Sequence, residues 1–161
     1  MRTRNLVAGV AVLIALAAFA ATTTTAQGKE PWVGTWKLNL AKSKYSPGPA
    51  AKSLTVVITA PDAGIKQVVD TVPATGPALH YEATGKFDGK DVPVKGNPNA
   101  DMQSFKKISD RSYEVTAKKG GKTVTTSVVV ISADGKTRTN TQTGTTADGK
   151  PMKNVLVYDR Q

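Results

Sequence analysis

Residues 112–131 read SYEVTAKKGGKTVTTSVVVI, and this stretch decides the class of fold. Apolar and polar side chains alternate as far as Ala117, and they alternate again after the Gly120–Gly121 pair. Alternation at every second residue is typical of a strand with one face on a core and the other in water. A Gly–Gly pair tolerates the positive φ that a tight hairpin turn requires. The stretch therefore predicts two antiparallel strands joined by a hairpin.

The same combination of alternation and turn residues recurs along most of the chain. Three further pairs predict tight turns between antiparallel neighbours: Asp88–Gly89, Asp134–Gly135 and Asp148–Gly149. Residues 41–52 are the one long break, and Pro47 and Pro49 disfavour a helix there. Outside this break the pattern predicts ten strands, at 32–39, 53–60, 65–72, 78–87, 90–95, 102–108, 112–118, 122–132, 136–145 and 150–160.

Ten antiparallel strands without helices to cover them must hide the edges of their sheet. Closing the sheet into a barrel removes the edges altogether. We therefore predict an all-β, antiparallel, up-and-down β-barrel of about eight to ten strands. Little or no helix is expected after the N-terminal segment, and a sandwich of two sheets is the alternative.

Alternation also predicts which side chains face the interior. The inward set includes Leu54, Val56, Ile58, Leu79, Tyr81, Ala83, Phe87, Tyr113, Val115, Val124, Val128 and Val130. His80 falls on the opposite face of its strand, so we expect it outside.

The first residues have the pattern of a targeting segment. Arg2 and Arg4 precede an almost unbroken apolar run over residues 6–20, and small residues follow before Gln27. This order is typical of a secretory signal peptide, and the run is shorter than a membrane span requires. We predict a signal peptide over residues 1–26, a barrel domain over 27–161, export to the periplasm or medium, and no stable membrane span after cleavage.

Composition excludes several kinds of chemistry. The chain has no Cys and a single His, which excludes disulfides, thiolate metal sites, Cys nucleophiles and His-rich metal centres. No nucleophile elbow, phosphate-binding loop or dinucleotide fingerprint occurs. We therefore predict no enzymatic activity, no metal and no cofactor, and we expect a monomer.

The chain is basic, with 22 Lys and Arg against 12 Asp and Glu and a formal charge of +10. A basic surface would attract an anionic polymer of the cell envelope, whereas export argues against nucleic acid as a partner. The other interpretation is a solvated surface that keeps the protein soluble. The lysines in question are Lys106, Lys107, Lys118, Lys119 and Lys122.

The two ends of the predicted barrel carry the motifs of a known superfamily. Residues 32–39 read WVGTWKLN and residues 155–160 read VLVYDR. A Gly-x-Trp on the first strand and a basic residue on the last resemble the calycins, which comprise lipocalins, fatty-acid-binding proteins and avidins. The resemblance implies an antiparallel barrel around a ligand cavity. It also implies that Trp36 closes one end beside Gly34, with Arg160 packed across the indole as a cation–π pair.

One position departs from the fatty-acid-binding proteins, which hold a ligand carboxylate with Arg-x-Tyr on the last strand. Tyr158 matches the Tyr, but Leu156 occupies the Arg position. Arg138 can take the place of that missing Arg only if one face of the strand over 136–145, the face with Arg138, Asn140 and Gln142, points inward. The Thr residues on the other face could line the interior instead, and the cost of burying an unpaired Arg favours that arrangement.

These observations predict an exported barrel that binds a small hydrophobic or amphipathic molecule noncovalently. The alternative is a periplasmic or surface module with a filled core that binds an anionic polymer, an envelope component or a protease. The candidate ligand contacts are Tyr81, Phe87, Phe105, Tyr113, Arg138, Asn140, Gln142 and Tyr158.

Overall fold

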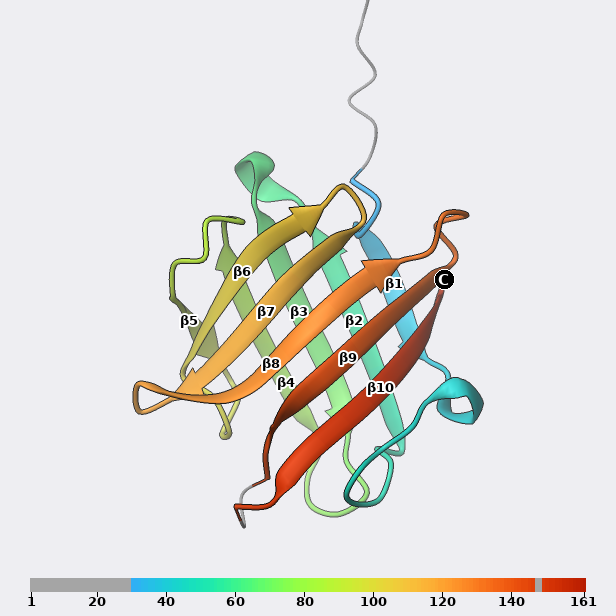
Figure 1. Cartoon of the computed structure of the whole chain (residues 1–161), viewed down its shortest axis with the longest axis vertical. Coiled ribbons are helices and arrows are strands. Elements are labelled where there is room, and N and C mark those ends of the chain that lie inside the picture. The colour runs from blue at the N-terminus through green and yellow to red at the C-terminus, as the bar shows by residue number, and fades with distance from the viewer. Residues whose placement is uncertain (1–29, 147–148) are drawn as a thin grey trace, which may run out of the picture.

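The computed structural model describes residues 30–146 and 149–161, so the predicted signal segment lies outside the described residues. This part of the chain forms a closed barrel of ten antiparallel strands (Figure 1). No helix in it is long and apolar enough to cross a membrane. The strands are β1 (Gly34–Leu38), β2 (Ser53–Thr59), β3 (Ile65–Val72), β4 (Leu79–Gly85), β5 (Val92–Lys95), β6 (Met102–Ser109), β7 (Ser112–Lys119), β8 (Lys122–Ile131), β9 (Thr137–Thr145) and β10 (Pro151–Arg160).

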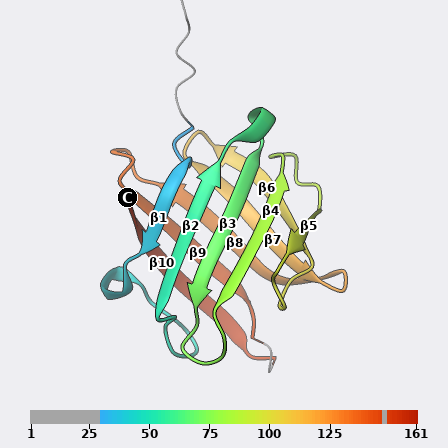
Figure 2. The ribbon, with the colours of Figure 1, turned by 180° about the vertical axis from the view of Figure 1, so that it is seen from behind.

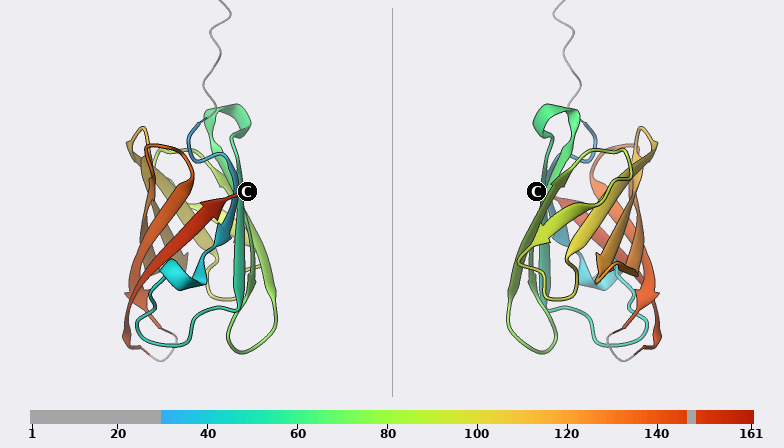
Figure 3. Two further views of the ribbon diagram at one scale, coloured as in Figure 1. Left: turned by 90° about the vertical axis from the view of Figure 1, so that its right-hand side faces the viewer. Right: turned by 90° about the vertical axis from the view of Figure 1, so that its left-hand side faces the viewer.

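Each strand pairs with the next along the chain, and β1 pairs with β10 to close the barrel. Strands β6–β10 form the wall nearest the viewer in Figure 1, and β1–β4 form the opposite wall in Figure 2. The side views in Figure 3 show these two walls crossing at an angle, as the strand tilt of a closed barrel requires. The barrel prediction and all ten predicted strands are confirmed, and the sandwich alternative is wrong.

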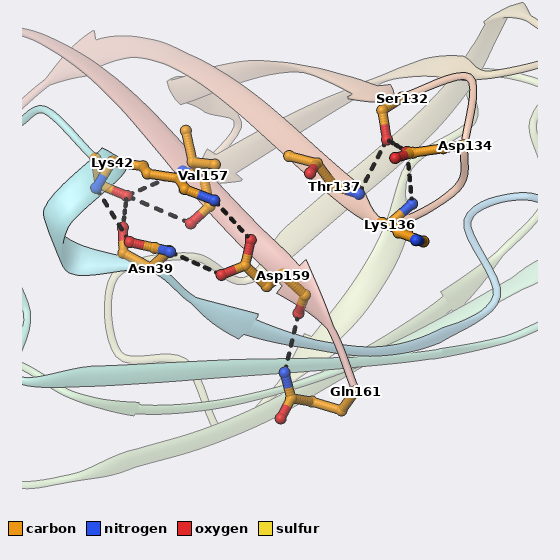
Figure 4. A network of polar contacts seen from close by, with 10 residues as sticks. Asn39, Lys42, Ser132, Asp134, Lys136, Thr137, Val157, Asp159 and Gln161 are labelled. Carbon is orange, nitrogen blue, oxygen red and sulfur yellow. Dashed lines mark hydrogen bonds and ion pairs between the residues drawn. The ribbon is translucent and has the colours of Figure 1, made fainter.

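Among the predicted turns that the structure describes in full, Gly120–Gly121 forms a two-residue hairpin. Asp88–Gly89 and Asp134–Gly135 lie within longer loops between antiparallel neighbours, where each Asp accepts a hydrogen bond from a backbone amide of its own loop. Asp148 lies outside the described residues. In the β8–β9 loop, Asp134 accepts hydrogen bonds from the Lys136 amide at 3.0 Å and the Ser132 hydroxyl at 2.6 Å (Figure 4). Both hydrogen bonds lower the pKa of Asp134, with the Ser132 contact the larger cause.

The segment after β1 lies alongside β10 and continues the pairing of β1, since Lys44 forms an antiparallel bridge with Val155. A single 3₁₀ turn, η1 (Leu40–Lys42), is followed by irregular chain, which agrees with the predicted break. Asn39 donates a hydrogen bond to Asp159 at 2.7 Å, and Lys42 lies 3.4 Å from the same carboxylate (Figure 4). The Asn39 contact is the larger cause that lowers the pKa of Asp159.

Aromatic side chains fill one end of the barrel, which we call the closed end. The Trp32 and Phe87 rings lie 4.9 Å apart, and both contact Tyr113 in edge-to-face geometry. Phe105 and Trp36 are fully buried in the same core. These large rings supply much of the buried area at this end.

Strand β8 departs from the predicted facing. Val129 and Ile131 are buried, whereas Val128 and Val130 are exposed on the outer surface, so the prediction for these two valines is wrong. The register shifts at Val124, because Ala117 pairs with Thr125 while Lys118 pairs with Thr123. One extra residue in a strand reverses which side chains point inward, and an apolar run at every position gives no signal of that change. His80 is exposed, as predicted, and contacts Asp70 at 2.6 Å.

Candidate functional site: an interior cavity

The half of the barrel opposite the closed end is hollow. A cavity of about 850 Å³ lies inside it and reaches the loop around Pro98, the β7–β8 hairpin and the β9–β10 turn, which we call the mouth. Much of its wall is apolar, formed by Leu54, Val56, Val69, Leu79, Val115 and Leu156. These side chains come from five strands whose inward faces alternate with solvated outer faces.

Arg138 lies in the wall of this cavity and is only 2% exposed. The arrangement with Thr137, Thr139, Thr141 and Thr143 inward is therefore wrong: Arg138, Asn140 and Gln142 line the cavity, and these four threonines lie on the other face of β9. The register gives the reason, because Arg138 pairs directly with Tyr158 on β10 and paired residues share a face of the sheet. Burying Tyr158 thus brings Arg138 inside with it.

The charge of Arg138 has no acidic counterpart nearby. Its guanidinium carbon lies 4.7 Å from the centroid of the Tyr158 ring, and its Nε and Nη1 donate no hydrogen bond within the described residues. No Asp or Glu of residues 30–146 and 149–161 lines the cavity. Burial lowers the pKa of Arg138, but the phenols of Tyr113 and Tyr158 outweigh it and raise the pKa overall, so Arg138 is a buried cation.

Two tyrosines supply neutral hydroxyl groups to the cavity wall. Burial raises the pKa of Tyr81 to about 12; the neighbouring Tyr158 adds to this rise and Arg138 opposes it. Burial likewise raises the pKa of Tyr158, against the lowering effect of Arg138. Both phenols therefore remain protonated near neutral pH and can donate hydrogen bonds to a ligand.

Three buried amides in the wall were not among the predicted contacts: Gln67, Gln103 and Asn154. Two of them occupy an inward position between apolar residues two places away: Gln67 between Ile65 and Val69, and Asn154 between Met152 and Leu156. A polar residue in the middle of an otherwise apolar face is a signal in the sequence that could have identified these two, whereas Gln103 follows Asp101 on its face and gives no such signal.

The structure divides the eight predicted contacts into two groups. Tyr81, Arg138, Asn140, Gln142 and Tyr158 line the cavity. The other three pack into the closed end instead, because its aromatic rings contact one another; they are Phe87, Phe105 and Tyr113. Phe87 also borders a separate space of about 190 Å³ beside Trp32.

The five lysines considered as one basic surface are divided between the two ends of the barrel. Lys119 and Lys122 line the mouth, whereas Lys106 and Lys107 lie toward the closed-end half of β6. Two of the five are in ion pairs, Lys107 with Asp110 at 3.0 Å and Lys118 with Asp91 at 2.7 Å. Among these lysines, Lys119 and Lys122 are the ones that contribute charge to the cavity.

Comparisons of the chain with protein-family models, curated proteins and solved structures gave no match. The class of protein is therefore defined by the architecture, a closed ten-stranded antiparallel barrel with an interior cavity. This architecture is compatible with a calycin-like fold. Within the part of the chain that the structure describes, no three His, Asp or Glu side chains gather to hold a metal ion.

Proposed function

We propose that the barrel binds a small amphipathic organic molecule noncovalently in its interior. The observation that carries this proposal is the cavity, whose volume of about 850 Å³ lies in the range of small-molecule sites. Its apolar wall would bury the body of a ligand, and its few converging polar groups would fix the orientation.

The ligand enters with an acidic group directed toward Arg138. The guanidinium is buried and has no anionic partner in the described chain, so an acid there would neutralise a charge that otherwise has only the rings and hydroxyls of tyrosines beside it. The protonated hydroxyl of Tyr158 is a second donor beside it. Lys119 and Lys122 at the mouth raise the local positive potential and attract anions to the entrance.

The alternative of a filled core with an active exterior has less support. It requires side chains to occupy the interior, and the cavity occupies that place instead. The lysines that would make an anion-binding outer surface are separated and partly neutralised by ion pairs.

The place of action proposed for this binding is outside the cytoplasm. Support comes from the sequence of residues 1–26, in which basic residues precede an apolar run and then small residues. Mass spectrometry of the protein from its producing cells tests this: a mature chain beginning near Gln27 is expected, and an intact N-terminus would contradict export.

The binding proposal is tested by native mass spectrometry of the protein from its own source, followed by titration with the anionic fluorophore anilinonaphthalene sulfonate. A bound small molecule, or uptake of one fluorophore per chain, is the expected result. Arg138→Met should weaken fluorophore binding about tenfold, the size of a lost charged contact. The matched control is Arg111→Met, because Arg111 lies on the outer surface. A native mass equal to that of the protein alone, together with no binding of the fluorophore, would overturn the proposal.

A further inference from the structure

We propose that the cavity selects an organic acid whose body carries hydroxyl groups over an acid with a plain hydrocarbon body. This inference rests on the proposed function, since it specifies the ligand of the same cavity. It depends on a separate observation, namely the amide groups left without partners along the wall.

Three residues that line the cavity have an amide side chain with a buried polar atom that lacks a partner. Gln67 is 8% exposed and its Oε1 accepts no hydrogen bond from the described residues. Gln103 is 4% exposed and its Nε2 finds no acceptor there. The Oδ1 atom of Asn140 is also buried without a partner, and all three residues line the cavity. Buried polar groups are nearly always satisfied in folded proteins, so three open ones in one cavity call for a ligand or water.

A fourth amide of the cavity shows that the barrel can satisfy such groups internally. Asn154 donates to Gln142 Oε1 at 3.1 Å and accepts from the Ser46 amide at 3.1 Å. The oxygen of that side chain holds Ser46 against β10, and its nitrogen links β10 to Gln142 on β9. Gln67, Gln103 and Asn140 have no comparable structural task among the contacts of the described chain.

The three open amides lie in different parts of the wall. Gln67 is on β3, where it pairs with Ala83 and sits one inward position from Ile65 of the closed-end core. Asn140 on β9 is one inward position nearer the mouth than Arg138. Gln103 on β6 pairs with Ala117 near the mouth end of β7. A ligand with its acid at Arg138 therefore passes polar groups along its body as well as at its end.

A hydrocarbon body and a hydroxylated body have opposite consequences at these positions. A hydrocarbon displaces water from each amide and leaves it unpaired, which weakens binding about tenfold for each group. A hydroxyl both donates and accepts, so it satisfies an amide whichever way that amide is turned. The apolar residues between the amides still contact the carbon skeleton.

The test compares two acids of one chain length, hexadecanoic acid and a trihydroxylated hexadecanoic acid. Each displaces anilinonaphthalene sulfonate from the full-length protein, below the concentration at which the acids form micelles. We expect the trihydroxylated acid to bind at least about tenfold more tightly. In a Gln67→Leu/Asn140→Leu double variant the preference should fall to what Gln103 alone supplies, because two of the three open amides are then apolar.

Thr141→Leu is the matched control, since Thr141 neighbours Asn140 on β9 but faces outward, and this variant should keep the preference. If the double variant does not fold, Asn140→Leu alone takes its place, and a partial loss of the preference is then the expected result. Equal or tighter binding of hexadecanoic acid to the native chain would overturn this inference and leave the binding function standing. If neither acid binds, this inference is overturned too. If, in addition, native mass spectrometry shows the protein without a bound molecule, the proposed function is overturned as well.

Discussion

The guanidinium carbon of Arg160 lies 4.1 Å from the centroid of the Trp36 indole ring. The same guanidinium donates hydrogen bonds to the backbone carbonyls of Pro31, Val33 and Gly135, so it joins the chain before β1 to the β8–β9 loop. Trp36 in turn donates from Nε1 to the Trp32 carbonyl at 2.9 Å. A residue near the end of the chain thus fixes its first strand at the closed end.

Arg160→Lys should lower the free energy of unfolding by about 2 kcal/mol. The planar guanidinium packs on the indole ring and donates to three carbonyls at once, and a lysine ammonium cannot do both. Urea unfolding followed by Trp fluorescence measures the change. Arg111→Lys is the control, since Arg111 makes a single exposed contact to the Ser132 carbonyl. Equal midpoints for the two variants would show that Arg160 does not hold the closed end.

Gly34→Ala should destabilise the barrel through the same contact. A Cβ at position 34 would lie 2.5 Å from Arg160 Nη1, and the φ of +146° is strained for any side chain. We expect a loss of about 2 kcal/mol or more, measured by the urea midpoint. Gly76→Ala is the comparison, because φ there is +89° but no atom lies within 4 Å of the added carbon. A smaller effect at Gly34 than at Gly76 would contradict the role of Arg160.

The facing of β8 predicts opposite outcomes for two adjacent valines. Val129 is 0% exposed and Val130 is 46% exposed. Val129→Thr should cost about 1–3 kcal/mol, because it buries a hydroxyl without a partner, whereas Val130→Thr should change stability by less than about 0.5 kcal/mol. Thermal unfolding of both variants measures this difference. The reverse order would place the bulge elsewhere in the strand.

Stability should decline at high pH as the buried tyrosines titrate. The pKa of Tyr81 is about 12 in the folded chain against 10.0 in the reference state, so the folded state holds this proton more firmly. Its contribution is therefore complete below about pH 10 and is lost as pH rises toward 12. Urea unfolding between pH 8 and about pH 11.5 should show the decline, and Tyr81→Phe should make it shallower. An unchanged slope in that variant would count against a buried neutral phenol.

Arg138→Met should raise the stability of the ligand-free protein by about 1 kcal/mol or more, because it replaces a buried charge that has no acidic partner with an apolar side chain of similar length. The same change should weaken binding of an acid, so stability and function move in opposite directions. Differential scanning calorimetry of the ligand-free protein measures the first effect. Lys119→Met, at the exposed mouth, should leave the melting temperature unchanged. A large loss of stability in Arg138→Met would mean that this cation has a structural partner.

Local sequence was sufficient for the strands and for much of the facing. Alternation placed Tyr81 and Tyr113 inside and His80 outside, and the structure agrees at each. Alternation failed where both faces of a strand offered similar residues. On β8 the apolar run conceals a bulge, and on β9 the cost of an unpaired Arg argued for the wrong face.

Half of the candidate site could likewise be predicted, and the remainder depended on distant partners. Arg138 is inside because its partner across the sheet, Tyr158, is a large apolar ring. Phe87 and Phe105 are inward but fill the closed end, and strand alternation carries no information on depth along a barrel. Gln67 and Gln103 were identified as site residues only from the structure, which places their strands around one cavity.

The sequence by itself determined ten strands and their antiparallel order, because these depend on residue spacing and turn chemistry along the chain. The contact of Arg160 with Trp36 was implied by the resemblance of the two end motifs to those of the calycins. Only the tertiary structure decided that one half of the barrel is packed and the other hollow. That outcome depends on register, on the bulge at Val124 and on the summed volumes of side chains from all ten strands. None of these quantities belongs to a local stretch of sequence.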